Sequence, residues 1–172
     1  MTGDSIELLE LSAISDDQRA SLAALTLPEA QYEYGGNFKS SMAECDAGDE
    51  ALIRGLVILA GQTPIGIVLL KRPPLSPNWA SEDAITLHGL KIDRRWQGRG
   101  YGRAALRKTI EVAKKIWPSA QKLALTVDAE NSTARELYRQ CGMQEVGVPT
   151  HGRIGLEHHF EIRLDEGVLG RS

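Results

Sequence analysis

Apolar and polar residues follow two periods along this chain, and these predict its strands and helices. Short runs of apolar, often β-branched residues indicate strands. Two of them, Leu52 to Ala60 and Ile65 to Arg72, are separated only by Gly61-Gln62-Thr63-Pro64, a spacing typical of a β-hairpin. The other predicted strands are Ser5 to Leu11, Ala84 to Asp93, Lys122 to Asp128, Met143 to Val148 and His158 to Leu164.

The helical period is clearest from Arg103 to Trp117, where apolar residues recur at i, i+4 and i+7 counted from Leu106. A second helix is predicted after Ser15, because Gln18 stands three residues later in a capping-box pattern. Two shorter helices are predicted at Asn37 or Lys39 to Cys45 and at Asn131 to Gln140.

The predicted order is β-α-α-β-β-β-α-β-α-β-β, an α/β fold with a mixed, mostly antiparallel sheet and flanking helices. Residues 84–128 should form a strand–helix–strand unit, a parallel crossover at the centre of the sheet. In its first strand the apolar positions change parity across Gly89, as the extra residue of a β-bulge would cause. With 172 residues, 42% of them apolar, the chain fits one domain over 1–172.

Charge and composition exclude several classes of protein. A net charge of −3 argues against a nucleic-acid binder that works through a basic face. No apolar run is long enough for a transmembrane helix, and Met1 to Asp4 do not begin a secretory signal, so no membrane partner is expected. Cys45 and Cys141 are the only cysteines, which favours a reducing, cytoplasmic location over a disulfide framework or a metal cluster.

The segment from Pro28 to Glu50 is strongly acidic, with Lys39 as its one basic residue. One interpretation is an ordinary solvated surface of helix and loop. The other is an acidic lip that attracts a cationic substrate. Its carboxylates are those of Glu29, Glu33, Glu44, Asp46, Asp49 and Glu50.

The clearest chemical signal is Gln97-Gly98-Arg99-Gly100-Tyr101-Gly102, which lies between a predicted strand and the most regular predicted helix. Alternating glycines leave backbone amides uncovered and allow close approach of a ligand. The first turn of a helix adds unpaired N–H groups and the positive end of the helix dipole. We therefore expect this stretch to bind the pyrophosphate of a nucleotide-derived cofactor, with Arg99 and Arg103 beside it.

Two common phosphate-binding motifs fit the stretch poorly. A P-loop needs Lys and then Ser or Thr after its last glycine, whereas Gly102 is followed by Arg103 and Ala104. A dinucleotide-binding fingerprint needs an acidic residue about 20 positions later, where this chain has Gln121 and Lys122.

The stretch instead resembles the Gln/Arg-x-x-Gly-x-Gly/Ala signature of the GNAT acetyltransferase superfamily, through Gln97, Gly100 and Gly102. The resemblance extends over residues 84–143, because a second family segment, Asn…Ala…Tyr…Gly-Phe, is matched further on. Its counterparts here are Asn131, Ala134, Tyr138, Gly142 and Met143, with Met143 in place of the usual Phe. The predicted element order agrees with the GNAT fold.

This resemblance implies acetyl-CoA as the cofactor and an amine as the acetyl acceptor. It implies that backbone groups of the strand before the glycines bond the pantetheine arm and the acetyl carbonyl. The glycine stretch would bind the pyrophosphate, and Asn131 would bond pantetheine through its side chain. The implied cofactor-binding residues are Leu90, Lys91, Ile92, Gln97, Gly98, Arg99, Gly100, Tyr101, Gly102, Arg103, Asn131, Ser132, Thr133 and Ala134.

Tyr138 is the candidate general acid. It lies two helical turns after Asn131, so both side chains face the same way. A phenol there could hydrogen-bond the departing sulfur and give it a proton. The alternative is a tyrosine that only packs in the core.

His88 is the candidate general base. It lies two residues before Leu90, where related polyamine acetyltransferases carry a carboxylate. An ordinary histidine pKa near ~6.5 suits proton removal at neutral pH. The alternative is a buried structural histidine, and Glu33, Tyr34, Asp83 or a water chain are other possible bases.

The functional hypothesis is an N-acetyltransferase that moves acetyl directly from acetyl-CoA to a small cationic primary amine in a ternary complex. The run from Ile92 to Gly102 looks most like bacterial enzymes related to diamine, spermidine and spermine acetyltransferases. One alternative is acetylation of a protein N-terminus or lysine. Another, of a different class, is a CoA-binding sensor without turnover. A homodimer is compatible with the resemblance, since many GNAT proteins dimerise.

Overall fold

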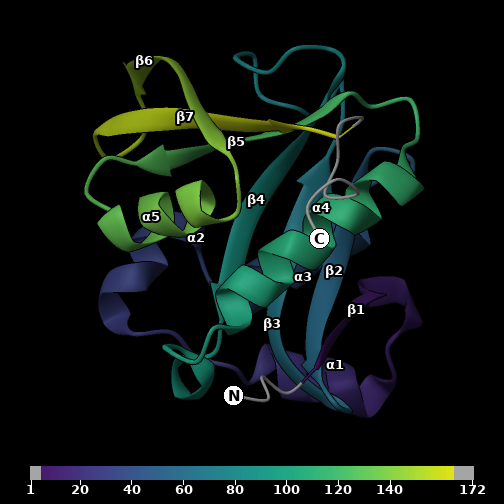
Figure 1. Ribbon diagram of the computed structural model, residues 1–172. Helices are drawn as coiled ribbons and strands as arrows, with labels where there is room; N and C mark the ends of the chain where they lie inside the picture. Colours follow the sequence, from purple (N-terminus) through teal and green to yellow (C-terminus); the bar gives the residue numbers. More distant parts are fainter. Residues whose placement is uncertain (1–4, 165–172) are drawn as a thin grey trace.

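The structure, a computed structural model, describes residues 5–164, which fold around a seven-stranded sheet in the order β1-β2-β3-β4-β5-β7-β6 (Figure 1). The elements in chain order are β1 (Ile6–Glu10), α1 (Asp16–Ala23), α2 (Tyr32–Gly35), α3 (Phe38–Ala47), β2 (Ile53–Ala60), β3 (Thr63–Lys71), β4 (Ala84–Ile92), α4 (Tyr101–Ile116), β5 (Lys122–Asp128), α5 (Ser132–Gln140), β6 (Gln144–His151) and β7 (Leu156–Arg163), with 3-10 turns at Leu11–Ala13, Glu29–Gln31 and Arg94–Trp96. The mixed, mostly antiparallel α/β fold predicted from the sequence is confirmed.

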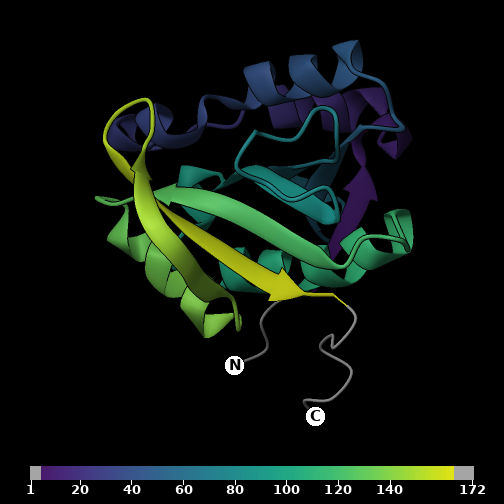
Figure 2. The same cartoon turned by 90° about the horizontal axis from the view of Figure 1, so that it is seen from above.

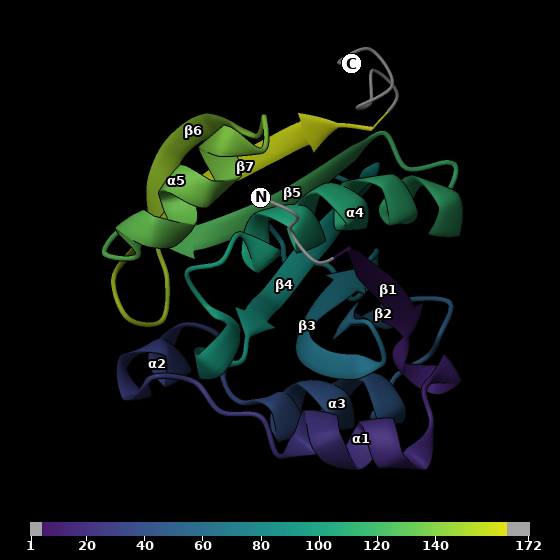
Figure 3. The same cartoon turned by 60° about the horizontal axis from the view of Figure 1, so that its bottom comes forward.

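Helices cover both faces of the sheet. Figures 2 and 3 show α1 and α3 on one face and α4 and α5 on the other. Strands β2 and β3 are buried on both sides, which explains their unbroken apolar sequences. Val57 and Ile67 pack under α1 and α3, whereas Leu56 and Val68 pack under α4. The core is therefore two apolar layers with the sheet between them.

The helix starts follow the capping patterns read from the sequence. Ser15 and Gln18 form a reciprocal capping box, and Asn37 caps α3 in the same way with Ser40. Asn131 caps α5, where its side chain accepts from the backbone N–H of Ala134.

Several boundaries differ from the prediction. The first helix was expected to end at Pro28, but α1 ends at Ala23, and the short α2 occupies part of the segment before α3. β6 runs on to His151, and β7 begins at Leu156. β3 includes Pro64, so the hairpin turn is shorter than predicted. α4 begins at Tyr101, inside the glycine stretch, because Gly100 can adopt the left-handed conformation that precedes it (φ +85°).

The predicted bulge at Gly89 is confirmed. Leu69 pairs with His88 and Ile67 pairs with Lys91, so Gly89 and Leu90 together oppose Val68 alone. Gly89 has a φ of +58°, which side chains disfavour. The extra residue turns Lys91 toward α3 and leaves Leu90 packed on the side of α4.

The parallel pair at the centre of the sheet separates soon after it begins. β4 and β5 pair only from Ala84 to Thr86 and from Lys122 to Ala124. Beyond that point the two strands diverge, which Figures 1 and 3 show. The edge of β4 from Leu87 to Ile92 therefore faces β5 without a strand partner, so backbone groups along it have no sheet hydrogen bonds on that side.

Within residues 5–164, none of the helices combines the length and the apolarity that crossing a bilayer requires.

Candidate active site

A cavity of about 1070 Å³ lies where β4 and β5 separate. One wall is formed by the glycine stretch and the first turns of α4 and α5. The opposite wall comes from α2, the 72–83 loop and the ends of β5 and β7. The cavity therefore runs past the unpaired edge of β4, and a ligand in it can reach the strand backbone from both faces of the sheet.

The glycine stretch holds an open backbone at the start of α4. Gly98 and Gly100 have φ values of +75° and +85°, and a Cβ at either position would meet nothing within 4 Å. The first turn of α4 thus begins beside the cavity, and the positive end of the helix dipole points toward it. The N–H groups of a first turn are the groups that bind phosphate at a helix start.

Gln97 ties this stretch to its surroundings. Its amide donates to the backbone oxygen of Ile92, at 2.8 Å, and exchanges two hydrogen bonds with the amide of Gln31. These bonds connect the end of β4, the glycine stretch and the segment before α2. The glutamine therefore sets the geometry of the stretch with its side chain.

The cavity gathers His88, Tyr138 and all but one of the cofactor-binding residues that the resemblance implied; of the other possible bases, Tyr34 lines it and Glu33 and Asp83 do not. Gln97, Gly98, Gly100, Tyr101, Gly102 and Arg103 line it, as do Leu90, Lys91, Ile92, Asn131, Ser132, Thr133, Ala134, Tyr138 and His88. Arg99 is not among the lining residues, and its guanidinium lies over the ring of Trp96, 5.6 Å from the centroid.

Tyr138 meets the cavity from α5. Its ring packs against Phe160, with 5.9 Å between the centroids, and only 8% of the residue is exposed. Burial raises the pKa of the phenol to about 12, so the hydroxyl keeps its proton throughout the neutral range. Tyr138 is therefore a core residue that also lines the cavity and keeps its phenol proton at neutral pH.

His88 also meets the cavity, but the expectation of an ordinary histidine pKa is wrong. Burial, reinforced by the positive charge of Lys71, lowers the pKa of His88 to about 4. Its Nε2 lies 2.7 Å from the hydroxyl of Thr86. The imidazole is therefore neutral at pH 7, hydrogen-bonded within β4, and a weak proton acceptor.

Lys91 contributes a buried amine to the same strand. Its Nζ donates to the hydroxyl of Ser41 at 2.6 Å and lies 6.0 Å from the ring centroid of Phe38. The residue is 6% exposed, and burial lowers the pKa of its ammonium to about 8. The sequence indicated only its backbone as functional, because burial of the side chain depends on α3 packing over β4.

The acidic lip hypothesis is not supported by the placement of the Pro28 to Glu50 carboxylates. None of them lines the cavity. Glu44 pairs with Lys71, and Asp46 forms a two-bond ion pair with Arg19. Only Gln31, Tyr34 and Gly35 of this segment reach the cavity wall.

Other carboxylates line the cavity instead, and sequence reasoning missed them. They belong to Asp128 at the end of β5, Glu130 just after it, Glu157 of β7 and Glu136 of α5. Burial raises the pKa of Asp128, and its Oδ1 is buried with no hydrogen-bond partner among the described residues. The position of Asp128 at the carboxyl end of a predicted parallel strand was the available signal.

The β6–β7 hairpin lies at one end of the cavity, where Glu157 lines it. Its tip lies beside α2 (Figures 2 and 3), where the Arg153 guanidinium donates to the backbone oxygen of Glu33. Asp128 and Glu157 are paired residues of β5 and β7 just behind that tip. Asp128 and Glu157 therefore lie together at the hairpin end of the cavity, whereas Glu136 shares Gln140 with Arg103 beside the glycine stretch.

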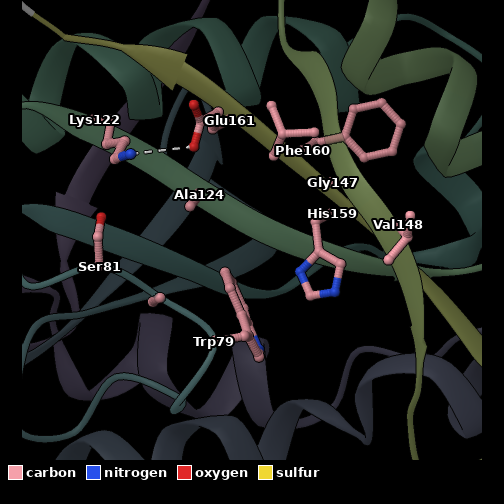
Figure 4. Close-up of a pocket in the computed structure, with 11 residues that line it drawn as sticks. Trp79, Ser81, Lys122, Ala124, Gly147, Val148, His159, Phe160 and Glu161 are labelled. Carbon is pink, nitrogen blue, oxygen red and sulfur yellow. Dashed lines mark ion pairs between the residues drawn. The ribbon is translucent and has the colours of Figure 1, made fainter.

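A second cavity of about 300 Å³ lies on the uncovered face of β5, β7 and β6 (Figure 4). Trp79 lines both cavities and stacks edge-on against His159, with 5.2 Å between the ring centroids. Lys122 and Glu161 form an ion pair at 3.4 Å along its floor. Trp79 is thus the wall between the two spaces.

Comparison with known proteins agrees with this geometry. Residues 18–143 match the Acetyltransferase (GNAT) family. The N-alpha-acetyltransferase RimI of Mycobacterium tuberculosis is 29% identical over 109 residues, which make up 63% of this chain and 63% of RimI. The uncharacterized N-acetyltransferase YycN of Bacillus subtilis is 42% identical over 53 residues, which make up 31% of this chain and 33% of YycN.

Solved structures share the fold. Spermidine N-acetyltransferase from Vibrio cholerae, in complex with CoA and spermine, superimposes with a TM-score of 0.71 at 18% identity and covers 94% of this chain and 96% of its own. The aminoglycoside acetyltransferase AAC(6')-Ib, in complex with coenzyme A, gives a TM-score of 0.77 at 15% identity and covers 98% of this chain and 100% of its own. With the family match over residues 18–143, the chain belongs to the GNAT acetyltransferase family.

Proposed function

We propose that this protein is an acetyl-CoA-dependent N-acetyltransferase whose acceptor is a small cationic primary amine. The observation that carries the proposal is the one cavity that joins a phosphate-binding helix start, an unpaired strand edge and a cluster of carboxylates. Each of these three features suits one part of the reaction.

The cofactor would lie along the unpaired edge of β4. The N–H groups from Gly98 to Arg103 would hold its pyrophosphate. Backbone groups of Leu90, Lys91 and Ile92 would bond the pantetheine arm and polarise the acetyl carbonyl. The side-chain amide of Asn131 would contact the pantetheine from the other side, with Ser132, Thr133 and Ala134 next to it.

The acceptor would bind at the end of the cavity that holds Asp128, Glu130 and Glu157. Asp128, Glu130 and Glu157 give this end a negative potential that attracts a polyvalent cation. The neutral amine attacks the thioester carbonyl, so the C–N bond forms as the C–S bond breaks. Tyr138 would give its proton to the departing sulfur and regain one from the new amide nitrogen.

Acetylation of a protein N-terminus is the second candidate, and the similarity to RimI favours it. A peptide needs a longer path than a small amine. The β6–β7 hairpin contacts α2 at that end of the cavity, which favours the small acceptor. A homodimer, a cytoplasmic location, the single domain over 1–172 and the absence of nucleic-acid and membrane partners stay predictions from the sequence.

Acetyl-CoA-dependent thiol release with a panel of acceptors tests the proposal: spermidine, spermine, putrescine, aminoglycosides, amino acids and short peptides. We expect release with a di- or polycationic amine and not with peptides. Glu157→Gln should raise the KM for that amine about five- to tenfold, which corresponds to roughly 1–1.4 kcal/mol. Glu161→Gln, on the same strand but at the smaller cavity, is the matched control and should leave the KM unchanged.

Three results would contradict this view. Release with peptides alone would favour the RimI-like activity. Equal effects of Glu157→Gln and Glu161→Gln would remove the role of the carboxylates. Acetyl-CoA binding with no release for any acceptor would favour the sensor hypothesis. Tyr138→Phe separates the enzyme from the sensor, because an enzyme should lose turnover while its affinity for acetyl-CoA is kept.

A further inference from the structure

The acceptor amine must lose a proton before it attacks, and the cavity contains an unassigned amine that suits this step. A primary ammonium has a pKa near ~10, so little of it is neutral at pH 7–8. Lys91 places a nearly fully buried side chain beside the proposed acetyl site, and Ser41 Oγ is its hydrogen-bond partner. Buried lysines without a carboxylate partner are costly and concentrate at functional sites.

The tip of Lys91 lies between two glycines that line the cavity. A Cβ added to Gly89 would be 3.1 Å from Lys91 Nζ, and a Cβ added to Gly35 would be 3.8 Å from Lys91 Cε. Gly89 is the bulged residue of β4, next to the backbone proposed to hold the acetyl group. The two glycine backbones lie against each other beside the lysine amine, and neither carries a side chain that would screen the amine from the cavity.

His88 is less suited to this step. Its Nε2 is already hydrogen-bonded to Thr86, on the same strand. Its low pKa means that it would hold a proton from an alkyl ammonium only weakly. A base works best when its pKa lies near the working pH.

We propose that the side-chain amine of Lys91 takes the proton from the bound acceptor ammonium. The Lys91 nitrogen forms an N–H bond as the acceptor N–H bond breaks, and this leaves a neutral acceptor amine and a charged lysine. The acceptor nitrogen then attacks the thioester carbon, and its second proton goes to the sulfur through Tyr138. Lys91 returns its proton to water before the next cycle. This inference rests on the proposed function.

The surroundings of Lys91 control which of the two nitrogens holds the charge. Two ammonium groups in one cavity repel each other, so binding of a cationic acceptor favours release of one proton. Burial lowers the pKa of Lys91 to about 8, which lets it lose that proton near neutral pH. The titratable and charged groups around Lys91 are Glu44 and Cys45 of α3, Lys71 of β3, His88 of β4 and Tyr34 of α2, of which only His88 and Tyr34 line the cavity.

Of these neighbours, Glu44 acts most directly on the charged form of Lys91, and it raises the pKa of the lysine. Its carboxylate is bound to Lys71, however, which limits this effect. Ser41 stabilises the charged form through its hydrogen bond, and Phe38 does so through its ring face. The lysine is thus held near the point where it exchanges a proton.

The test is the pH profile of kcat/KM with the best amine of the panel, for the wild type and for Lys91→Met. The active form is the neutral lysine, so wild-type activity should rise with pH and flatten above about 8. The profile of Lys91→Met should lack this inflection, and its kcat/KM at pH 7.5 should be about 100-fold lower than that of the wild type. This kcat/KM should keep rising with pH until the acceptor itself loses its proton in solution. Lys39→Met, which removes an exposed charge from α3, is the control and should keep the wild-type profile.

Ser41→Ala keeps the lysine and serves if Lys91→Met does not fold. Loss of the hydrogen bond from the ammonium should lower the pKa of Lys91 and move the inflection to lower pH. If the inflection is unchanged in Ser41→Ala, or in a folded Lys91→Met that binds acetyl-CoA, Lys91 is not the base. The proposed acetyltransferase function would be unaffected by that result. Wild-type inactivity with every amine would overturn the proposed function and this step with it.

Discussion

Replacement of Asp93 by alanine should destabilise the protein by about 3 kcal/mol, and the structure shows why. Asp93 follows β4 and is fully buried. Its Oδ2 accepts the backbone N–H of Thr26 at 3.0 Å. Its Oδ1 accepts the backbone N–H of Arg95 at 3.0 Å and the Arg95 guanidinium at 2.8 Å. The carboxylate thus joins the segment before α2 to the turn that leads into the glycine stretch.

The size of the effect follows from which of these bonds are sheltered from water. The Arg95 side chain is 70% exposed, so its ion pair should contribute no more than about 1 kcal/mol. The two backbone bonds to a charged, buried acceptor are worth about 1.5–3 kcal/mol each, and alanine would leave both donors without a partner. The lower end of that range gives the estimate of about 3 kcal/mol, a change of roughly 100-fold in the folding equilibrium.

Urea unfolding of Asp93→Ala, with Arg95→Met as the control, measures how much of the stabilisation comes from the backbone hydrogen bonds and how much from the ion pair. Asp93→Ala should lower the free energy of unfolding by about 3 kcal/mol, and Arg95→Met by less than about 1 kcal/mol. Acetyl-CoA affinity should fall in Asp93→Ala, because the turn before Gly98 loses its anchor. The reasoning is wrong if Arg95→Met costs as much as Asp93→Ala, or if Asp93→Ala costs less than about 1 kcal/mol.

Three further predictions concern the same region. Burial acts to raise the pKa of Asp93, but the hydrogen bonds to its carboxylate outweigh burial, so the pKa is lowered. The stabilisation from this carboxylate is therefore present above the unfolded pKa of about 3.9 and is lost as pH falls through the folded pKa. Urea midpoints should fall more steeply on acidification for the wild type than for Asp93→Ala. Gln97→Ala removes the bond to Ile92 and the pair with Gln31, so it should raise the KM for acetyl-CoA severalfold with little change in kcat. Gly89→Ala must hold φ near +58°, at a cost of about 1–2 kcal/mol, and crowds Lys91, so both the unfolding free energy and the turnover rate should fall.

The sequence by itself determined the order of the strands and of the longer helices, and it predicted where a cofactor would bind. Apolar periodicity separates the buried strands from α4, and the parity change at Gly89 reveals a bulge, because both patterns depend on neighbours in the chain. Pyrophosphate binding by the glycine stretch could be predicted from the sequence, because the amides involved come from consecutive residues. The family resemblance indicated Asn131 and Tyr138 as further site residues. Both belong to α5, one as its N-cap, so the helix itself places them on the same side.

Only the tertiary structure decided which charged residues line the cavity. Glu44 and Asp46 looked available in the sequence, but α3 packs on the sheet and places Lys71 and Arg19 against them. Asp128 and Glu157 are far apart in sequence and become neighbours because β5 pairs with β7. The pKa values of His88 and Lys91 also depend on burial by elements from elsewhere in the chain. Local pattern does not encode desolvation, so these properties follow from packing alone.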